Sequence, residues 1–269
     1  MDSTRLHYRP AYQHVLDAYL AGLERTLRPE AVAGVYLTGS IALGDYRHGQ
    51  SDLDILTLTT RPLTDAELDA LDALHKELEH GAQPHTDAHY VPRDFVGEMP
   101  PADLPGQAFV VDGVFHRGLG HQDLVTWATL DQCGITLRGP KAETLSAGPD
   151  PAAFAAWNRG NLEEYWRAQA ASVRAHFAEH EDDRELPAWL AVWLGTGPGR
   201  LHRTIADGTI ISKTRSAEYT AEVFPAYAEL LTRVRASRLG EGSAGFGRAD
   251  AFALCDLIDE ICDSASLPG

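Results

Sequence analysis

The sequence predicts an α+β protein in which a half built of strands and helices, residues 1–148, precedes a helical half, residues 149–269. In the first half, short apolar runs alternate with amphipathic stretches, which indicates strands that pack against helices. In the second half, nearly all apolar residues recur at helical spacing. The cluster Gly148-Pro149-Asp150-Pro151 interrupts both patterns, so it marks the expected domain boundary.

The chain begins with a predicted amphipathic helix over residues 10–27, because Pro10 suits a first helical turn and apolar residues follow at helical spacing. A strand is predicted over 34–38, where the run Val35-Tyr36-Leu37 lies. A short helix starting at Ser40 or Ile41 comes next, and its free amides would favour an anion. After a polar, glycine-containing turn, a second strand is predicted over 53–59.

A longer helix is predicted from Pro62 to about His80. Thr64 is the expected N-cap, and Glu67 three residues later completes the pattern of a capping box. The rest of the first half is predicted as a strand over 86–91, extended pieces around 108–116, a helix over 123–133 and a strand over 135–140. Beyond the boundary, helices are predicted over 151–181, 187–206, 215–239 and 247–264.

The composition indicates a globular cytoplasmic protein. Hydrophobic residues make up 44% of the chain, yet no apolar stretch is long enough to span a membrane, and the first residues lack the apolar core of a signal peptide. The three cysteines, Cys133, Cys255 and Cys262, show no metal-binding spacing and leave one unpaired in any disulfide scheme. A reducing compartment is therefore expected.

The formal net charge of −16 argues against a nucleic acid as the partner. Proteins that follow a phosphate backbone normally carry a basic stripe, and this sequence has none. An acidic protein attracts small cations through its summed field. The alternative is that the charge only keeps the protein in solution.

The strongest motif for chemistry runs from Gly39-Ser40 to Asp52 and Asp54. Residues two apart on a strand face the same side, so both carboxylates project together. Two hard oxygen ligands beside a loop with free backbone amides suit Mg²⁺ that carries a nucleoside triphosphate. Taken singly, an Asp-X-Asp is more often a solvated turn, and Ser40 would serve equally as an N-cap.

The segment Leu37-Thr38-Gly39-Ser40-Ile41-Ala42-Leu43-Gly44-Asp45, with Ser51-Asp52-Leu53-Asp54 after it, resembles the nucleotidyltransferase superfamily of the DNA polymerase β type. Within it, the pattern is most similar to the aminoglycoside adenylyltransferases that act on streptomycin and spectinomycin. The resemblance implies a nucleotidyltransferase-type mixed-sheet domain followed by an all-α helical bundle. It also implies ATP as co-substrate, Mg²⁺ as cofactor and an active site between the two domains.

Carried over to this sequence, the resemblance makes Asp52 and Asp54 metal ligands, with Gly39, Ser40 and Ser51 at the phosphates. A third carboxylate is usual on a neighbouring strand, and Asp87 occupies that place. It would be the general base or complete a second metal site. The family tends to have Glu there, and the alternative is a surface Asp. Zinc bound by His85, Asp87 and His89 is disfavoured, since Cβ atoms at these intervals lie too far apart.

The second motif is Gly208-Thr209-Ile210-Ile211-Ser212-Lys213, which precedes a predicted helix. It resembles the family segment in which a lysine contacts the triphosphate, and an ammonium suits a phosphate tail. The chain has only two other lysines, Lys76 and Lys141. Arg200, thirteen residues before Lys213, also matches a family arginine, with a helix-surface ion pair as its alternative.

Carboxylates and aromatic faces commonly hold sugars with ammonium groups. The candidates for the acceptor are Glu163, Glu164, Asp182, Asp183 and Glu185, with Trp127, Trp157, Trp166, Trp189 and Trp193 as stacking surfaces. These positions do not match those of the streptomycin-type enzymes. Most of the residues are better explained as solvated charges and core aromatics.

The sequence therefore predicts a Mg²⁺-dependent nucleotidyltransferase that transfers AMP from ATP to a hydroxyl of an aminoglycoside-like small molecule, with no nucleic acid or membrane partner. Two alternatives stay open. One is nucleotidylation of another small molecule or natural-product intermediate. The other is a non-catalytic nucleotide-binding or antitoxin-like module, which would not need Asp52, Asp54 and Asp87 together.

Overall fold

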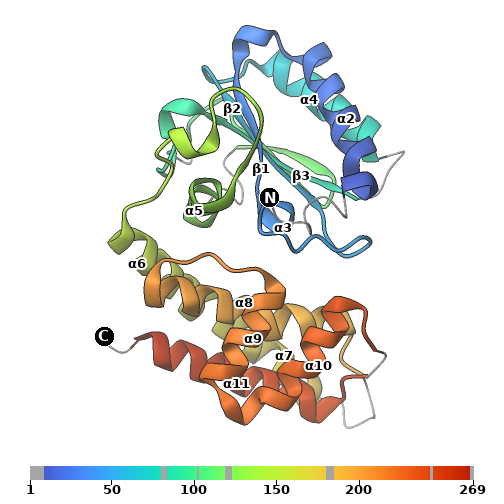
Figure 1. Ribbon diagram of the computed structural model, residues 1–269, viewed down its shortest axis with the longest axis vertical. Helices are drawn as coiled ribbons and strands as arrows, with labels where there is room; N and C mark the ends of the chain where they lie inside the picture. Colours follow the sequence, from blue (N-terminus) through green and yellow to red (C-terminus); the bar gives the residue numbers. More distant parts are fainter. Residues whose placement is uncertain are drawn as a thin grey trace. The chain divides into compact units, whose positions relative to one another are not determined.

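A computed structural model describes residues 9–79, 84–101, 103–118, 123–179, 185–242 and 245–266. The chain divides into two compact units, Met1–Pro149 and Asp150–Gly269 (Figure 1). The first combines a sheet with helices and the second is helical, and each is described by itself.

The first unit is built on a six-stranded mixed sheet in the order β5-β4-β3-β2-β1-β6. Its neighbouring strands pair antiparallel, except β2 and β3, which are parallel. The strands are β1 (Val32–Leu37), β2 (Leu53–Thr59), β3 (Thr86–Pro92), β4 (Ala108–Val111), β5 (Val114–Arg117) and β6 (Ile135–Arg138). Each strand predicted from the sequence is present, with bounds that differ by at most two residues at either end.

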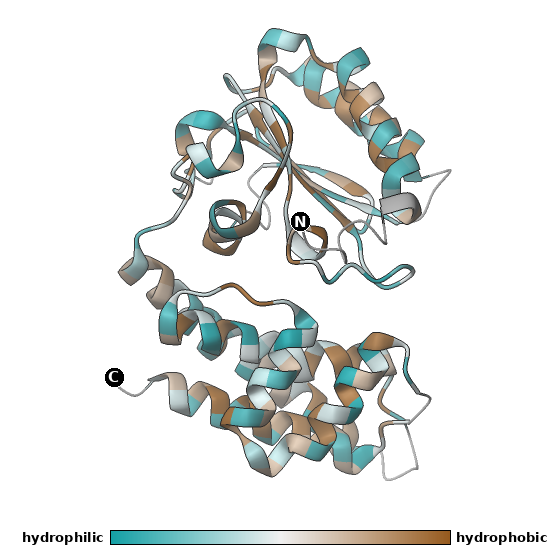
Figure 2. Ribbon diagram, in the orientation of Figure 1, coloured by the Kyte–Doolittle hydropathy of each residue, from teal (hydrophilic) through white to brown (hydrophobic). Residues whose placement is uncertain are grey.

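One face of the sheet carries the core of this unit. Helices α2 (Arg9–Thr26) and α4 (Asp65–Glu79) lie side by side across it (Figure 1). Both show the mixture of hydrophobic and hydrophilic residues of amphipathic helices (Figure 2). Alternate strand residues meet them, and the fully or nearly fully buried ones include Val35, Leu37, Leu53, Ile55, Ala88, Tyr90, Ala108 and Val110. Because side chains alternate along a strand, the residues between them face the other side.

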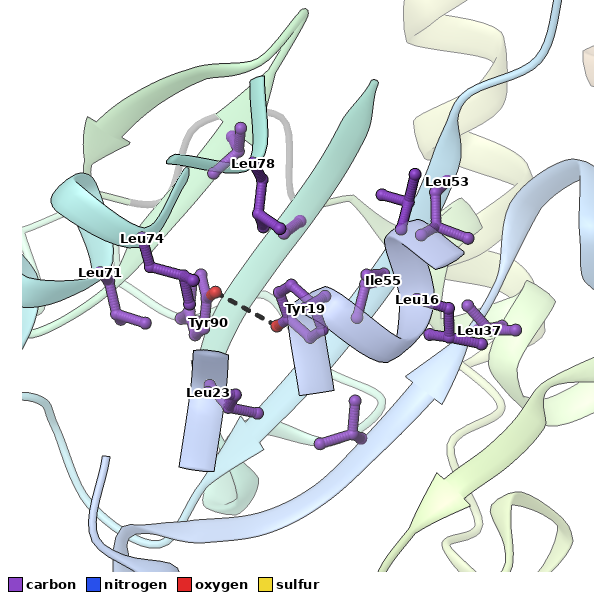
Figure 3. Close-up of a cluster of buried hydrophobic side chains, with 14 of the residues drawn as sticks. Leu16, Tyr19, Leu23, Leu37, Leu53, Ile55, Leu71, Leu74, Leu78 and Tyr90 are labelled. Carbon is purple, nitrogen blue, oxygen red and sulfur yellow. Dashed lines mark hydrogen bonds between the residues drawn. The ribbon is translucent and has the colours of Figure 1, made fainter. Parts of the chain in front are cut away.

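A chain of hydrogen bonds crosses this apolar core. The Tyr19 hydroxyl bonds the Thr57 hydroxyl at 2.8 Å and the Tyr90 hydroxyl at 3.1 Å (Figure 3). The Tyr90 hydroxyl is also 2.8 Å from Nε2 of His75, whose Nδ1 is 3.3 Å from the Thr86 hydroxyl. All five residues are fully buried, so the chain satisfies polar groups that have no access to water.

The capping box predicted at the start of α4 is confirmed. The Thr64 amide donates to Glu67 Oε2 at 2.8 Å, and the Glu67 amide donates to the Thr64 hydroxyl at 3.3 Å. Arg61 also bonds both carboxylate oxygens of Glu67. This bond to Arg61 is the main reason that the pKa of Glu67 is lowered to about 2.

The opposite face of the sheet is covered in part by α5 (Leu124–Cys133), on the side away from α2 and α4 (Figure 1). Asp123 caps α5 by accepting from the Thr126 amide at 2.8 Å. Trp127 is fully buried, and its indole donates to the carbonyl of Glu98 at 2.7 Å. Trp127 therefore belongs to the core and is withdrawn as a stacking surface for an acceptor.

The second unit is a bundle of helices with its own core. Its helices are α6 (Pro151–Asn161), a π-helix (Leu162–Trp166), α7 (Arg167–Glu179), α8 (Ala188–Asp207), α9 (Lys213–Val223), α10 (Ala228–Leu239) and α11 (Arg248–Ser266). The bundle interior is mostly aliphatic and includes Leu194, Leu231, Val234, Leu254, Leu257 and Ile258.

Two predicted helices of this unit differ from the structure. The helix expected over 215–239 is interrupted by a 3₁₀ turn, Pro225–Tyr227, because Pro225 has no amide hydrogen to continue α9. The helix expected over 151–181 contains the π-helical turn at Leu162–Trp166 and ends, within the described residues, at Glu179. Such turns leave no periodicity signal in a sequence.

No helix in the described ranges is both long and apolar enough to cross a membrane. All three cysteines are free thiols, and Cys255 and Cys262 are buried in the second unit. Burial raises the pKa of Cys255 to about 11 and that of Cys262 to about 12. Their thiols are therefore protonated at neutral pH and act as apolar packing groups.

Candidate active site

Asp54 and Asp87 are direct partners in the parallel register of β2 and β3. Both lie on the face of the sheet opposite α2 and α4, because their neighbours Leu53, Ile55 and Ala88 point into the core. Asp52 lies two residues before Asp54, just ahead of the first residue of β2. The fold thus places the predicted third carboxylate one strand away from the Asp-X-Asp pair.

The Gly39-Ser40 segment closes over Asp54. The Thr38 amide donates to the carbonyl of Asp54 at 3.0 Å, and the Ser40 amide lies 3.4 Å from its Oδ2. The short helix α3 (Gly39–Ala42) begins here with Thr38 as its N-cap, so Ser40 is not the N-cap that the sequence allowed. The Ser40 hydroxyl is buried and has no hydrogen-bond partner in the described part of the chain, which leaves it available to a ligand.

Gly39 is required at its position for two reasons. Its φ is +53°, a region in which a residue with a Cβ is strained. A Cβ would also lie 1.9 Å from Asp54 Oδ2, which would force that carboxylate to move. The sequence assigned Gly39 to close approach of a phosphate, and the close neighbour seen in the structure is the Asp54 side chain.

We expect Gly39→Ala to reduce turnover at least tenfold and to destabilise the protein by about 1–2 kcal/mol, because it both strains the backbone and displaces Asp54. Gly49→Ala is the matched control, since Gly49 also has a positive φ, +76°, but an added Cβ would meet nothing within 4 Å. Thermal unfolding and kcat separate the two effects. Equal loss of turnover in both variants would contradict the role of the contact with Asp54.

Ser51 has a structural role in this loop. Its buried hydroxyl accepts from the Arg47 amide at 3.0 Å, and its own amide donates back to the Arg47 carbonyl at 2.8 Å. These bonds close the turn that leads into Asp52. The hydroxyl that the sequence assigned to phosphates therefore already holds the backbone.

The electrostatics of the site centre on Asp87. Burial, and then the charges of Asp54 and Asp52, raise the pKa of Asp87 to about 7. The amide of Asp112 donates to Asp87 Oδ1 at 3.0 Å and holds the carboxylate in place. Asp112 and Gly113 both have positive φ and form the tight turn between β4 and β5. The Asp-Gly pair is a strong hairpin signal, and it could have indicated this contact from the sequence.

The carboxylates fit a cation only in part. Within the described ranges, no three His, Cys, Asp or Glu side chains are grouped closely enough to hold a metal ion. However, Mg²⁺ is usually bound by one or two carboxylates together with substrate phosphates and water, not by a complete protein cage. Burial, and then the charges of Asp54 and Asp52, raise the pKa of Asp87, and a cation placed among these carboxylates would offset their repulsion.

A pocket of about 90 Å³ opens beside the two aspartates. Asp54 and Asp87 contribute its acidic groups, and β3, β4 and α5 supply the other walls. The lining residues are Thr38, Asp54, Ile55, Asp87, His89, Phe109, Val110, Val111 and Thr126. His85 is not among these lining residues. Its Nδ1 is hydrogen-bonded to Glu79 Oε2 at 2.5 Å.

The remaining predicted phosphate ligands belong to the second unit. Lys213 is the first residue of α9, and Ser212 caps that helix by accepting from the Arg215 amide at 3.3 Å. Arg200 lies in α8. The two helices pack closely, since the Ser216 hydroxyl donates to the carbonyl of Thr196 at 2.6 Å.

The acceptor candidates of this unit fall into different surroundings. Trp166 is buried against Trp193 with ring centroids 4.5 Å apart, whereas Trp189 is 70% exposed. Glu163 bonds Arg167 at 2.6 Å, which explains it as a helix-surface ion pair. Asp182 and Asp183 lie outside the described residues.

Residues 21–109 match the model of the nucleotidyltransferase domain, and this match includes Gly39, Ser40, Asp52, Asp54 and Asp87. More particularly, the chain shares its fold with the crystal structure of a spectinomycin adenyltransferase from Enterococcus faecialis with ATP and spectinomycin. That match covers 95% of this chain and 99% of the other, with a TM-score of 0.60 and 15% identity. No curated protein sequence is significantly similar. The predicted α+β fold, with a mixed sheet followed by helices, is confirmed.

Proposed function

We propose that the protein transfers AMP from ATP, in a Mg²⁺-dependent reaction, to a hydroxyl of an aminoglycoside-like small molecule. The observation that carries this proposal is the register of β2 and β3, which sets Asp87 beside Asp54. The Ser40 amide lies 3.4 Å from Oδ2 of Asp54. Residues 1–148 would carry the reacting groups, and residues 149–269 would contribute Lys213 and Arg200.

Each residue has a role that its surroundings support. Asp52 and Asp54 would hold Mg²⁺, which lowers the charge on the phosphates and on the leaving pyrophosphate. The buried Ser40 hydroxyl would donate to a phosphate oxygen. Asp87 would accept the proton of the attacking hydroxyl, since its carboxylate is fixed by the amide of Asp112. Ser51 would act through the turn that leads into Asp52.

The start of α9 is electrostatically suited to phosphate. A helix N-terminus carries partial positive charge, and a lysine there adds to its attraction for an anion. The first turn of α9 contains Lys213 and Arg215 and no acidic residue. Lys213 would therefore bind the triphosphate, with Arg200 of the adjacent helix as a second cation.

We expect Lys213→Ala to raise the Kd for ATP about 10- to 100-fold, because a charge-assisted bond to phosphate contributes about 1.5–3 kcal/mol. Its effect on folding should be small. Lys76→Ala is the matched control, since Lys76 is exposed and pairs with Asp72 on the surface at 2.8 Å. Calorimetric titration with ATP and Mg²⁺ measures both. An unchanged Kd for the Lys213 variant would remove this residue from the site.

The acceptor is proposed to be cationic because the chain has a net charge of −16. The structural neighbour was crystallised with spectinomycin, which favours the same class of acceptor. The reaction would take place in the cytoplasm, where ATP and Mg²⁺ are available and free thiols stay reduced.

The test is pyrophosphate release from ATP with a panel of hydroxylated acceptors that includes streptomycin and spectinomycin. We expect release only when an acceptor and Mg²⁺ are both present, and loss of release on chelation by EDTA. Release with a neutral acceptor alone would favour another small-molecule substrate. No release with any acceptor would favour a non-catalytic nucleotide-binding module.

A further inference from the structure

We propose that Glu79, the last residue of α4, is a positioning residue for the reaction. Its carboxylate joins the β4–β5 turn to the start of β3 and so keeps the Asp112 amide aimed at Asp87. Glu79 acts through the backbone around the proposed base and contacts neither substrate. The inference rests on the proposed function and adds a contact that fixes its geometry.

Helix α4 holds the β4–β5 hairpin at two places before Glu79 is reached. Arg117 of β5 forms ion pairs with Asp65 and Asp69 in the first half of α4, each at 2.6 Å. Two residues earlier on β5, the ring centroid of Phe115 lies 6.1 Å from that of His75. Alternate residues of β5 therefore face α4, and this row runs toward the C-terminal end of the helix.

The next contact in the row is between Glu79 and Gly113. Gly113 is the second residue of the two-residue turn between the paired residues Val111 and Val114, and its φ is +72°. A Cβ built on Gly113 would lie 2.1 Å from Cδ of Glu79, so the carboxylate lies directly against the backbone of the turn. Glu79 therefore occupies the space that a glycine leaves free at this position.

The same carboxylate is bound to the start of β3. Nδ1 of His85 is 2.5 Å from Oε2 of Glu79, and the Thr86 amide lies 3.5 Å from Oε1. The His85 carbonyl accepts from the Leu53 amide at 2.8 Å, which fixes this segment beside the strand that carries Asp54. The Glu79 side chain is only 20% exposed, so it is a shielded group between two segments and not a solvated charge.

These contacts converge on Asp87. From one side, Asp87 follows Thr86 directly in β3. From the other side, the Asp112 amide of the turn donates to its Oδ1 at 3.0 Å. Because N–H···O bonds weaken beyond about 3.2 Å, a small shift of the turn would release the carboxylate. Glu79 thus sets the place of the donor, and the donor sets the orientation of the proposed base.

The test compares Glu79→Ala with Glu79→Gln, using the panel member that gives the highest pyrophosphate release. Ala removes both contacts, whereas Gln keeps the length of the side chain and an oxygen that can accept from His85. We expect Glu79→Ala to reduce kcat about tenfold while the KM values for ATP and acceptor change less than about threefold, because a misplaced base slows the chemical step more than binding. Glu79→Gln should stay within about threefold of the wild type in all three constants.

Hydrogen exchange of the Asp112 amide, followed by NMR, measures the link without turnover. We expect this amide to exchange at least about tenfold faster in Glu79→Ala than in the wild type, and Glu79→Gln to restore its protection. Glu77→Ala is the matched control. It removes an acidic residue from the same last turn of α4, but Glu77 is exposed and pairs with Arg25 at 3.7 Å. It should leave kcat and the exchange of Asp112 unchanged.

An unchanged kcat or an unchanged Asp112 exchange in Glu79→Ala would overturn the proposal, whatever happens to the Tm. A lower Tm alone would make Glu79 a residue that only stabilises the end of α4. If the wild type released no pyrophosphate with any acceptor, the proposed function would fail and Glu79 would position no reacting group. The Asp112 exchange would still differ between Glu79→Ala and the wild type in that case, so the two failures are distinguishable.

Discussion

Replacing Asp54 by Asn should reduce kcat at least a thousandfold while leaving the fold intact. The amide has nearly the same shape and can still accept from the Ser40 amide, so the packing of the Gly39-Ser40 segment is preserved. What is lost is the negative charge that would hold Mg²⁺. In addition, Asp54 is one of the charges that raise the pKa of Asp87, so the variant should also lower that pKa.

Pyrophosphate release and thermal unfolding measure these effects. Asp52→Asn should show the same loss, because Asp52 is the second proposed ligand. Asp94→Asn provides a surface control, since the Asp94 side chain is 81% exposed. Full activity in Asp54→Asn would show that the metal assignment is wrong, whereas a large fall in Tm would place this carboxylate among the structural groups.

Acidification should destabilise the protein through His75. Burial lowers the pKa of His75 from 6.5 to about 4 in the folded state. Between these values the unfolded chain binds a proton that the folded chain does not, so the free energy of unfolding falls as the pH falls. The contribution is complete above pH 6.5 and lost progressively toward pH 4. It amounts to about 3 kcal/mol for a shift of this size.

Urea unfolding of the wild type and His75→Gln between pH 4 and pH 7.5 tests this expectation. The free energy of unfolding of the wild type should fall by about 3 kcal/mol relative to that of His75→Gln as the pH falls, because Gln does not titrate. Tyr90→Phe is the control, since it removes one hydrogen bond to His75 but keeps the imidazole buried. A difference that stays constant with pH would contradict the assignment of the proton to His75.

Sequence patterns located the elements of the first unit because its local signals agree with one another. The Thr64–Glu67 capping box, the apolar alternation of β2 and the Gly39-Ser40 motif each depend on a few adjacent residues. The same patterns failed at Pro225 and at the π-helical turn Leu162–Trp166, where one residue changes the backbone path inside an otherwise helical stretch.

The sequence likewise predicted only some features of the candidate active site. The Asp52 and Asp54 pair and the importance of Asp87 were inferred from residue types and spacing, together with a family resemblance. The roles of single groups were not, since Ser51 proved to bond the Arg47 amide and Gly39 proved to meet the Asp54 side chain. Such contacts join residues whose neighbours in space are not their neighbours in sequence.

By itself, then, the sequence determined the class of chemistry and the order of the elements, because both are carried by local periodicity and a short motif. Only the tertiary structure decided that Asp87 stands beside Asp54 and that the Asp112 amide fixes it. The reason is physical: strand pairing sets these distances, and pairing is determined by the packing of the whole sheet on α2 and α4.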